Sequence, residues 1–298
     1  MKKANELPGE EKKKSYLFAG AAIFMWSTVS TISKLLLAEM DSYKVLCIST
    51  FFAALTMLII NLCSKKFSIM KSYRLKDYLK MALIGLPGVF LYYAFYYAGT
   101  ARMSASQAFI INYLWPIMSI LLACLLLKEK LTARKLLALG LSFLGVFTVA
   151  GDGLIHFQAE TVMGMVLCFA AAVCYGLFTV LNKKSNYDKQ VSMTVAMFAA
   201  FLPSLAIVLW QGADLRLTVT QLPGILWNGI FTMALANLTW ALALSSGSTA
   251  KISNLAYVTP FLSLLWTSLI LKEPLRLSAI LGLCLIVSGI FIQLHDRE

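Results

Sequence analysis

Aromatic and amide side chains occupy positions several residues inside long apolar stretches of this 298-residue chain. Tyr92, Tyr93 and Tyr96 would share one face of a helix by their i, i+3 and i+4 spacing, and Asn112 and Trp115 lie three residues apart. Ring faces and neutral amides bind ligands by apolar contact, by attracting cations and by hydrogen bonding. These residues therefore predict non-covalent binding of an amphipathic or zwitterionic solute.

Groups for bond-making chemistry are missing from the same stretches. None of the 14 Asp and Glu residues falls at the centre of an apolar stretch, and His156 and His295 lie in a loop and at the end of the chain. The six cysteines form no metal or redox pattern, and no P-loop for ATP is present. We therefore predict no enzyme, no metal, no cofactor and no use of ATP. The same absence leaves these stretches without the Asp, Glu or His that usually pass protons through apolar surroundings.

The composition indicates a membrane protein. Apolar residues make up 59% of the chain and charged residues 13%, against about 45–50% and about 25% in soluble domains. The net charge of +12 comes from Lys and Arg in short loops between the apolar stretches. This distribution excludes nucleic acid as a partner and leaves the lipid bilayer as the solvent for the apolar surface.

Ten apolar stretches are long enough to cross a bilayer core of about 30 Å, which needs roughly 20 helical residues. Lipid offers no partner for an open strand edge, so each stretch is predicted to be a helix. The predicted spans are Ser15–Ala38, Tyr43–Cys63, Leu79–Ala101, Met103–Leu127, Ala133–Ala150, Thr161–Asn182, Val191–Gln211, Leu222–Leu244, Ala250–Leu271 and Leu277–Leu294.

Lysine and arginine distribute unevenly between the two sides of these spans. With the N-terminus inside, twenty of them lie on the inner side and five on the outer side. Because positive residues favour the cytoplasmic side, we expect a multi-pass protein of the cytoplasmic membrane with both termini in the cytoplasm. Lys34 and Lys183 lie near span ends, where their side chains are expected to extend to the interface.

The sequence repeats itself at an offset of 144 residues. The matched pairs include Tyr113 with Tyr257, Pro116 with Pro260, Ser119 with Ser263, Lys128-Glu129 with Lys272-Glu273, and Gly145 with Gly289. Each copy contains five spans, an odd number, so the second copy must be inverted relative to the first. The predicted fold class is therefore an all-α integral membrane protein with ten transmembrane helices in two inverted five-helix repeats.

The repeat also divides the chain and pairs its candidate residues. We expect a cytoplasmic tail (1–14), a first repeat (15–150), a second repeat (151–294) and a short C-terminal tail (295–298). Trp26 corresponds to Tyr175 at an offset of 149, and Asn237 and Trp240 lie under Tyr93 and Tyr96. The candidate substrate-binding residues are Trp26, Tyr92, Tyr93, Tyr96, Asn112, Trp115, Tyr175, Asn237, Trp240 and Tyr257.

Plainer interpretations stay open for these residues. Aromatic rings can belong to interfacial belts or to ordinary packing, and Asn112 and Asn237 can form inter-helix hydrogen bonds without touching a substrate. Pro116 and Pro260 remove backbone hydrogen bonds within their spans. We interpret this matched pair as hinges or cavity-shaping kinks, with static kinks as the alternative.

The repeated pattern resembles the EamA family of the drug/metabolite transporter superfamily. Each half carries a proline-containing helix, then Lys-Glu-x-Leu, then a glycine-bearing helix, and the likeness runs from about Tyr16 to Ile292. The run Asn112-Tyr113-Leu114-Trp115-Pro116 resembles the YddG-type aromatic amino-acid exporters of that family. The resemblance implies a carrier whose central cavity alternates between the two sides. Some of these exporters have a histidine in the third helix, where this chain reads Leu91-Tyr92-Tyr93-Ala94-Phe95-Tyr96-Tyr97.

These observations together predict a secondary transporter for a small amphipathic metabolite. The leading substrate is an amino acid with an aromatic or large apolar side chain, and the family resemblance implies export. A drug cation, nucleoside, polyamine or phosphorylated metabolite on the same fold is the alternative. A non-transporting structural or regulatory membrane protein is a further one. The oligomeric state stays open, a monomer included.

Overall fold

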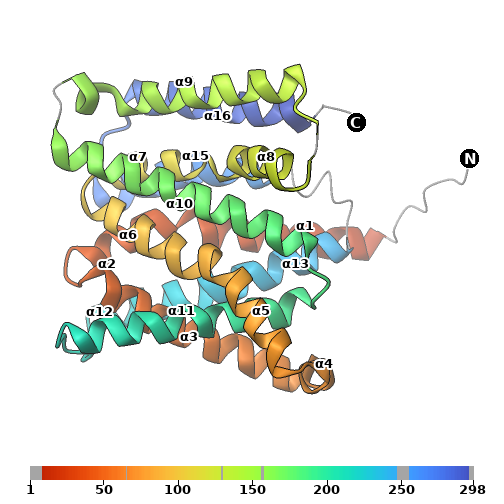
Figure 1. The fold of residues 1–298 in the computed structure, drawn as a ribbon. Coiled ribbons are helices and arrows are strands. Elements are labelled where there is room, and N and C mark those ends of the chain that lie inside the picture. The colour runs from red at the N-terminus through yellow and green to blue at the C-terminus, as the bar shows by residue number, and fades with distance from the viewer. Residues whose placement is uncertain (1–8, 65, 129, 156–157, 247–254, 295–298) are drawn as a thin grey trace, which may run out of the picture.

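The computed structural model describes residues 9–64, 66–128, 130–155, 158–246 and 255–294, and the elements within them are helices (Figure 1).

Several spans are broken into consecutive helical segments. The first five spans are α1 (Gly9–Ser27) with α2 (Val29–Leu37), α3 (Ser42–Cys63), α5 (Leu75–Leu86) with η1 (Pro87–Leu91) and α6 (Tyr92–Ala101), α7 (Ala105–Asn112) with α8 (Trp115–Leu126), and α9 (Ala133–Ile155). The next five are α10 (Ala159–Lys184), α11 (Lys189–Trp210), α12 (Gln221–Leu226) with η2 (Trp227–Leu235) and α13 (Ala236–Ser246), η3 (Ala256–Val258) with α15 (Thr259–Leu271), and α16 (Leu277–Leu294). A short helix, α4 (Lys66–Ser72), connects α3 to α5.

Length and hydropathy agree with ten membrane crossings. Seven helical stretches among the described residues are long and apolar enough to cross a bilayer. Two shorter apolar helices, Ala256–Leu271 and Leu277–Ile292, follow them in the sequence. The 23-residue helix α9 completes the set. The outer surface carries large apolar side chains such as Leu136, Phe147 and Leu281, each at least half exposed, as expected of side chains that face lipid. The predicted all-helical membrane fold is confirmed.

The segment breaks recur at equivalent places in the two repeats. In the third and eighth spans a π-helical segment interrupts the α-helix at η1 and η2. In the fourth and ninth spans the α-helix begins anew with proline in its first turn, Pro116 in α8 and Pro260 in α15. Proline fits the first turn because its missing N–H has no helical partner there.

Packing and backbone geometry repeat as well. A Cβ atom at Gly85 would lie 2.3 Å from Cβ of Ala196, so the third span approaches the seventh closely. A Cβ atom at Gly229, the repeat partner of Gly85, would lie 2.5 Å from the carbonyl oxygen of Ser49, so the eighth span approaches the second. Lys128 and Lys272 both adopt positive φ, 58° and 57°. These exchanged contacts are those of two inverted repeats, which confirms the predicted fold class.

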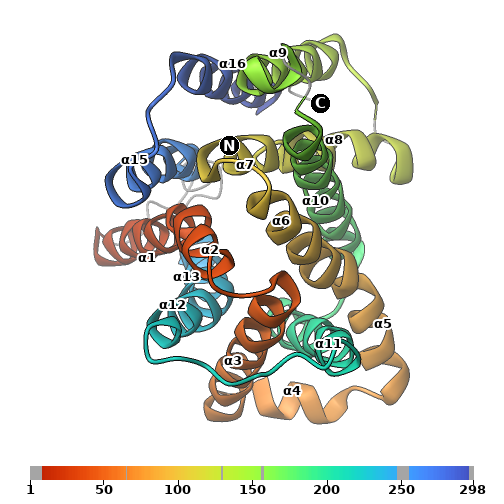
Figure 2. The ribbon, with the colours of Figure 1, turned by 90° about the vertical axis from the view of Figure 1, so that its left-hand side faces the viewer.

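The ten spans form two three-helix units and two flanking pairs (Figure 2). The first unit contains α5–α6, α7–α8 and α10, in which α10 packs against both other spans. The second unit contains α1–α2, α12–α13 and α15, in which α1 packs against α13 and α15. The pair α3 and α11 flanks the units on one side, and the pair α9 and α16 flanks them on the other.

The molecule has two ends along the direction of its spans, the Asp188 end and the Glu273 end, each called after a residue that lies there. At the Asp188 end lie the start of α1, the end of α16 and the connection from α10 to α11 (Figure 1). At the Glu273 end lie the connection from α6 to α7 and the connection from α15 to α16 (Figure 1). The spans run between these two ends, so a path across the membrane would run between them as well.

Candidate functional site

A cluster of rings, here called the tyrosine wall, lies inside the first unit. It contains Tyr92, Tyr93 and Tyr96 from α6, Trp115 from α8 and Tyr175 from α10. The ring centroids of Tyr92 and Tyr175 are 5.0 Å apart, and those of Trp115 and Tyr175 are 5.1 Å apart with the planes at 79°. Tyr92 stacks on Tyr96 at 5.9 Å. Three helices therefore bring together five of the predicted site residues.

Asn112 adds the polar group of this wall. It ends α7, and the break before α8 places it next to Tyr92, to whose hydroxyl oxygen its Nδ2 atom donates a hydrogen bond of 2.9 Å. The side chain is buried, and its Oδ1 atom has no hydrogen-bond partner among the described residues. The hydroxyl of Tyr96 is buried and lacks a partner in the same sense. A buried acceptor without a donor is costly, so Asn112 is a candidate partner for a donor group of a ligand.

A second group, here called the tryptophan wall, lies inside the second unit. The rings of Trp26 from α1 and Trp240 from α13 are 5.4 Å apart with their planes at 56°. Their repeat partners are Tyr175 and Tyr96, which belong to the tyrosine wall. Asn237 is half-buried near the start of α13, and its Nδ2 atom donates to the carbonyl oxygen of Met233 in the preceding turn. Its amide therefore satisfies its own backbone rather than a neighbouring helix.

Tyr257 and the two prolines occupy other surroundings. The ring of Tyr257 packs on Phe291 of α16 at 4.9 Å and joins the apolar cluster beneath α9 and α16. The structure thus places it with the flanking pair instead of with either wall. Pro116 and Pro260 each stand second in a helix that follows a break in the α-helical hydrogen bonding, so the two prolines lie at equivalent places in the repeats.

A buried polar cluster that was not predicted from the sequence joins three spans. Asn228 of η2 donates from Nδ2 to the hydroxyl of Tyr97 at 2.7 Å and to Oγ of Ser49 at 3.0 Å. All three atoms are buried, and they tie the third span to the eighth and the second. The signal was available, because Asn228 is an amide inside an apolar stretch like Asn112 and Asn237, and such a group must find a partner.

Lys34, which is predicted to extend to the interface, has backbone partners at the end of a neighbouring span. Its Nζ atom is half-buried and donates to the carbonyl oxygens of Thr100 at 2.8 Å and Met103 at 2.7 Å. The side chain therefore satisfies backbone acceptors of the first unit from its place on α2. Among the described residues, no group of three His, Cys, Asp or Glu side chains is arranged to hold a metal ion.

Comparison with known proteins places this arrangement in a family. The EamA-like transporter family matches residues 13–151 and again residues 162–294. A crystal structure of a protein with 18% sequence identity superposes with a TM-score of 0.68, over 95% of this chain and 96% of that one. This likeness supports the ten-helix fold.

Curated relatives include transporters from bacteria and archaea. The uncharacterized transporter YvbV of Bacillus subtilis is 26% identical over 94% of this chain and 91% of its own. An uncharacterized transporter of Archaeoglobus fulgidus is 26% identical over 76% of this chain and 81% of its own. The aromatic amino acid exporter YddG of Ancylobacter novellus is 26% identical over 61% of this chain and 64% of its own.

The family match covers both halves of the chain and therefore nearly all ten spans. The predicted resemblance is confirmed, and so is the prediction of a transporter rather than an enzyme, since the family and these relatives are transporters. A multi-pass membrane protein with a small-molecule substrate follows from this membership. The chain belongs to the EamA-like transporter family.

Proposed function

We propose that this transporter carries amino acids with aromatic or large apolar side chains out of the cell across the cytoplasmic membrane. The observation that carries the proposal is the buried amide of Asn112 beside the tyrosine wall, whose Oδ1 atom has no partner among the described residues, together with a second aromatic group in the other unit. Rings would pack against the apolar side chain of such a solute, and Asn112 would accept a hydrogen bond from its ammonium group.

The named relative supports the same substrate class. The exporter YddG of Ancylobacter novellus is named for aromatic amino acids, and this chain carries the run from Asn112 to Pro116 on which the resemblance to such exporters rests. The basic residues predict an orientation with both chain ends and the Asp188 end in the cytoplasm, and the gradient of the solute would set the direction of transport. In this assignment Pro116 and Pro260 act as paired hinges at the breaks in the fourth and ninth spans.

Neutral side chains in the spans favour transport that is not coupled to protons. The acidic residues of the chain lie in loops, tails and at helix edges, so a proton relay across the middle of the membrane lacks its usual groups. We therefore assign exchange or facilitated diffusion along the gradient of the solute.

Counterflow in proteoliposomes tests this function. Vesicles loaded with unlabelled tryptophan, phenylalanine, threonine or a cationic dye would meet labelled tryptophan outside, with no ion gradient imposed. The expected result is uptake of label into vesicles that hold tryptophan or phenylalanine, and loss of that uptake in Trp115→Ala and Asn112→Ala. Uptake that requires an imposed pH gradient would contradict the assigned mechanism. Faster uptake of label into vesicles that hold the cationic dye than into those that hold tryptophan would indicate that the substrates are cations.

A further inference from the structure

A carboxylate at the Glu273 end holds the start of α7 from a distant part of the chain. Glu273 accepts hydrogen bonds from the backbone N–H of Ala105 at 2.7 Å and of Ser106 at 3.0 Å, and from Oγ of Ser106 at 2.6 Å. Ala105 and Ser106 are the first residues of α7, whose initial N–H groups have no partner within the helix. A negative charge there also meets the positive end of the helix dipole.

Lys34 holds the other side of the same connection. Its ammonium group donates to the carbonyl oxygens of Thr100 and Met103, at the end of α6 and just beyond it. Lys34 and Glu273 thus carry opposite charges and both bind backbone groups of the connection from α6 to α7, here called the α6–α7 corner. Both side chains belong to the second unit, since Lys34 lies on α2 and Glu273 directly follows α15, whereas the corner they hold belongs to the first unit.

The wider packing places the main contact between the units at this end. The most extensive contacts between them join α2 to α6, α2 to α7 and α7 to α15. Each of these helices is the half of its span that lies toward the Glu273 end (Figure 1). A carrier with inverted repeats works by rocking one unit against the other, so that one end opens while the other closes.

We propose that Glu273 and Lys34 form the gate that closes the Glu273 end of this transporter, and that both must release the α6–α7 corner for that end to open. The inference rests on transport by alternating access and not on which solute is carried. The basic residues predict that this end is extracellular, so the structure is closed to the outside.

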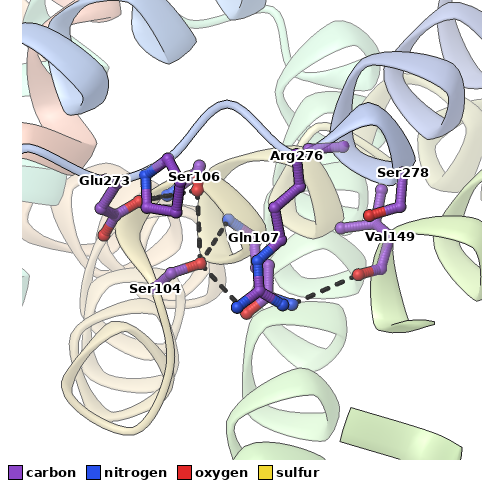
Figure 3. A pocket seen from close by; sticks show the side chains of 9 residues that line it. Ser104, Ser106, Gln107, Val149, Glu273, Arg276 and Ser278 are labelled. Atoms are coloured by element: carbon purple, nitrogen blue, oxygen red, sulfur yellow. Dashed lines mark hydrogen bonds between the residues drawn. The ribbon is translucent and has the colours of Figure 1, made fainter. Parts of the chain in front are cut away.

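The surroundings of Glu273 allow the gate to be reversible. A cavity of about 80 Å³ adjoins the carboxylate and is lined by Ser104, Gln107 and Arg276, among others (Figure 3). Figure 3 shows the guanidinium group of Arg276 in this cavity, beside the side chain of Gln107. Polar groups and water in the cavity can thus form hydrogen bonds with the Glu273 carboxylate once the N–H groups of α7 move away. These bonds limit the free-energy cost of opening the gate.

Cysteine labelling of purified protein in nanodiscs tests the gate. Thr100 is fully buried below the corner, so Thr100→Cys would react with a hydrophilic thiol reagent only when this end opens. Parent protein that lacks this cysteine gives the background from the six native ones. Both faces of a nanodisc are reached by the reagent, so neither the membrane orientation nor the substrate affects the result.

The expected result is labelling of Thr100→Cys about tenfold faster when Glu273→Gln or Lys34→Met is added, since bonds to charged groups of this kind shift equilibria by about this factor. Ser106→Ala, which deletes one of the three bonds and leaves the charge, should raise the rate by a factor of about two to three. Glu160→Gln is the matched control, because Glu160 pairs with Arg102 at the same end through a largely exposed side chain. It should leave the rate unchanged.

A second cysteine separates gating from general loosening. Ser192 is buried near the Asp188 end on α11, and Ser192→Cys should label no faster after Glu273→Gln. Equal acceleration at both sites would overturn the proposal, because the carboxylate would then only stabilise the fold. Unchanged labelling of Thr100→Cys would overturn it as well. If Glu273→Gln cannot be purified, Ser106→Ala and Lys34→Met decide between the same outcomes.

Discussion

The two three-helix units share a backbone plan and differ in the side chains that they enclose. Both contain a π-helical interruption, a proline-led helix and a glycine in close contact with a flanking span. One encloses tyrosines and a tryptophan beside Asn112, and the other encloses Trp26 against Trp240. Duplication thus conserved the features that set helix geometry, and the walls diverged. In the proposed site, these unlike walls would contact the two unlike ends of an amino acid.

One position shows how the divergence was accommodated. A Cβ atom at Gly88 in η1 would lie 2.1 Å from the ring of Phe178 on α10. The repeat partner of Gly88 is Thr232, whose hydroxyl donates to Oδ1 of Asn228 at 3.0 Å, and the partner of Phe178 is Val29. A glycine beside a large ring in the first unit therefore corresponds to two residues of intermediate size in the second.

The largest expected effect comes from moving one of these residues between units. Gly88→Thr should lower the free energy of unfolding by about 3 kcal/mol, because the added atoms overlap the ring of Phe178. Phe178→Val alone should lower it by about 1–3 kcal/mol through lost packing. The double variant recreates the pair of the second unit and should recover much of the loss, as neighbouring sites are not additive.

Thermal unfolding of the purified variants in detergent measures this coupling. Gly140→Ala is the control, since a Cβ atom there has no neighbour within 4 Å. If the losses of unfolding free energy in the two single variants simply add in the double variant, the sizes of the side chains at the positions of Gly88 and Phe178 are not coupled. That result would contradict the interpretation that each unit packs this position with a matched pair of residue sizes.

A smaller effect should follow from the hydrogen bond that distinguishes the tyrosine wall. Tyr92→Phe keeps the ring contacts but removes the acceptor of Asn112 Nδ2, and should lower the free energy of unfolding by about 1–2 kcal/mol. Tyr175→Phe also keeps its ring, and the Tyr175 hydroxyl has no hydrogen bond with Asn112 among those of the described residues, so this variant serves as the comparison. Equal losses in both variants would show that the amide of Asn112 is not held by Tyr92.

The smallest effect concerns the flanking pair α3 and α11, which touches both units. Burial raises the pKa of Asp188, but Lys66 and the backbone N–H groups of Val191 and Gln190 lower it more, so the pKa lies below its ordinary value. Asp188 therefore stabilises the fold above its unfolded pKa of about 3.9, and this contribution is lost as the pH falls through the lower folded value.

Asp188→Asn keeps a side chain that can cap α11 and removes the charge. At pH 7 it should lower the free energy of unfolding by less than about 1 kcal/mol, since the ion pair is partly exposed. The difference from the parent should shrink as the pH is lowered below about 4 in unfolding scans. A difference that grows on acidification would reverse the assigned sign.

The sequence predicts the spans because the length of an apolar stretch can be read from consecutive residues. It predicts their inversion because the repeat has a constant offset and each copy has an odd number of spans. It does not predict that Trp26 pairs with Trp240 while Tyr92 contacts Tyr175, since helix periodicity says which residues share a face and not which helices meet. Nor does the sequence predict that Tyr257 packs on Phe291 of α16 rather than on either wall. Glu273 looked like an ordinary loop residue, because its partners lie 168 and 167 residues away.

Equilibrium binding of labelled tryptophan to purified protein tests most directly the claim that both units build the substrate site. Binding does not depend on the orientation of the protein in a membrane or on coupling of transport to an ion. We predict saturable binding, weakened about tenfold by Trp115→Ala in the tyrosine wall and by Trp26→Ala in the tryptophan wall, a loss of roughly 1.4 kcal/mol for each. Tyr257→Phe, outside both walls, should bind as the parent does. Absence of saturable binding to folded protein, or binding that neither wall variant weakens, would contradict a substrate site built from both units.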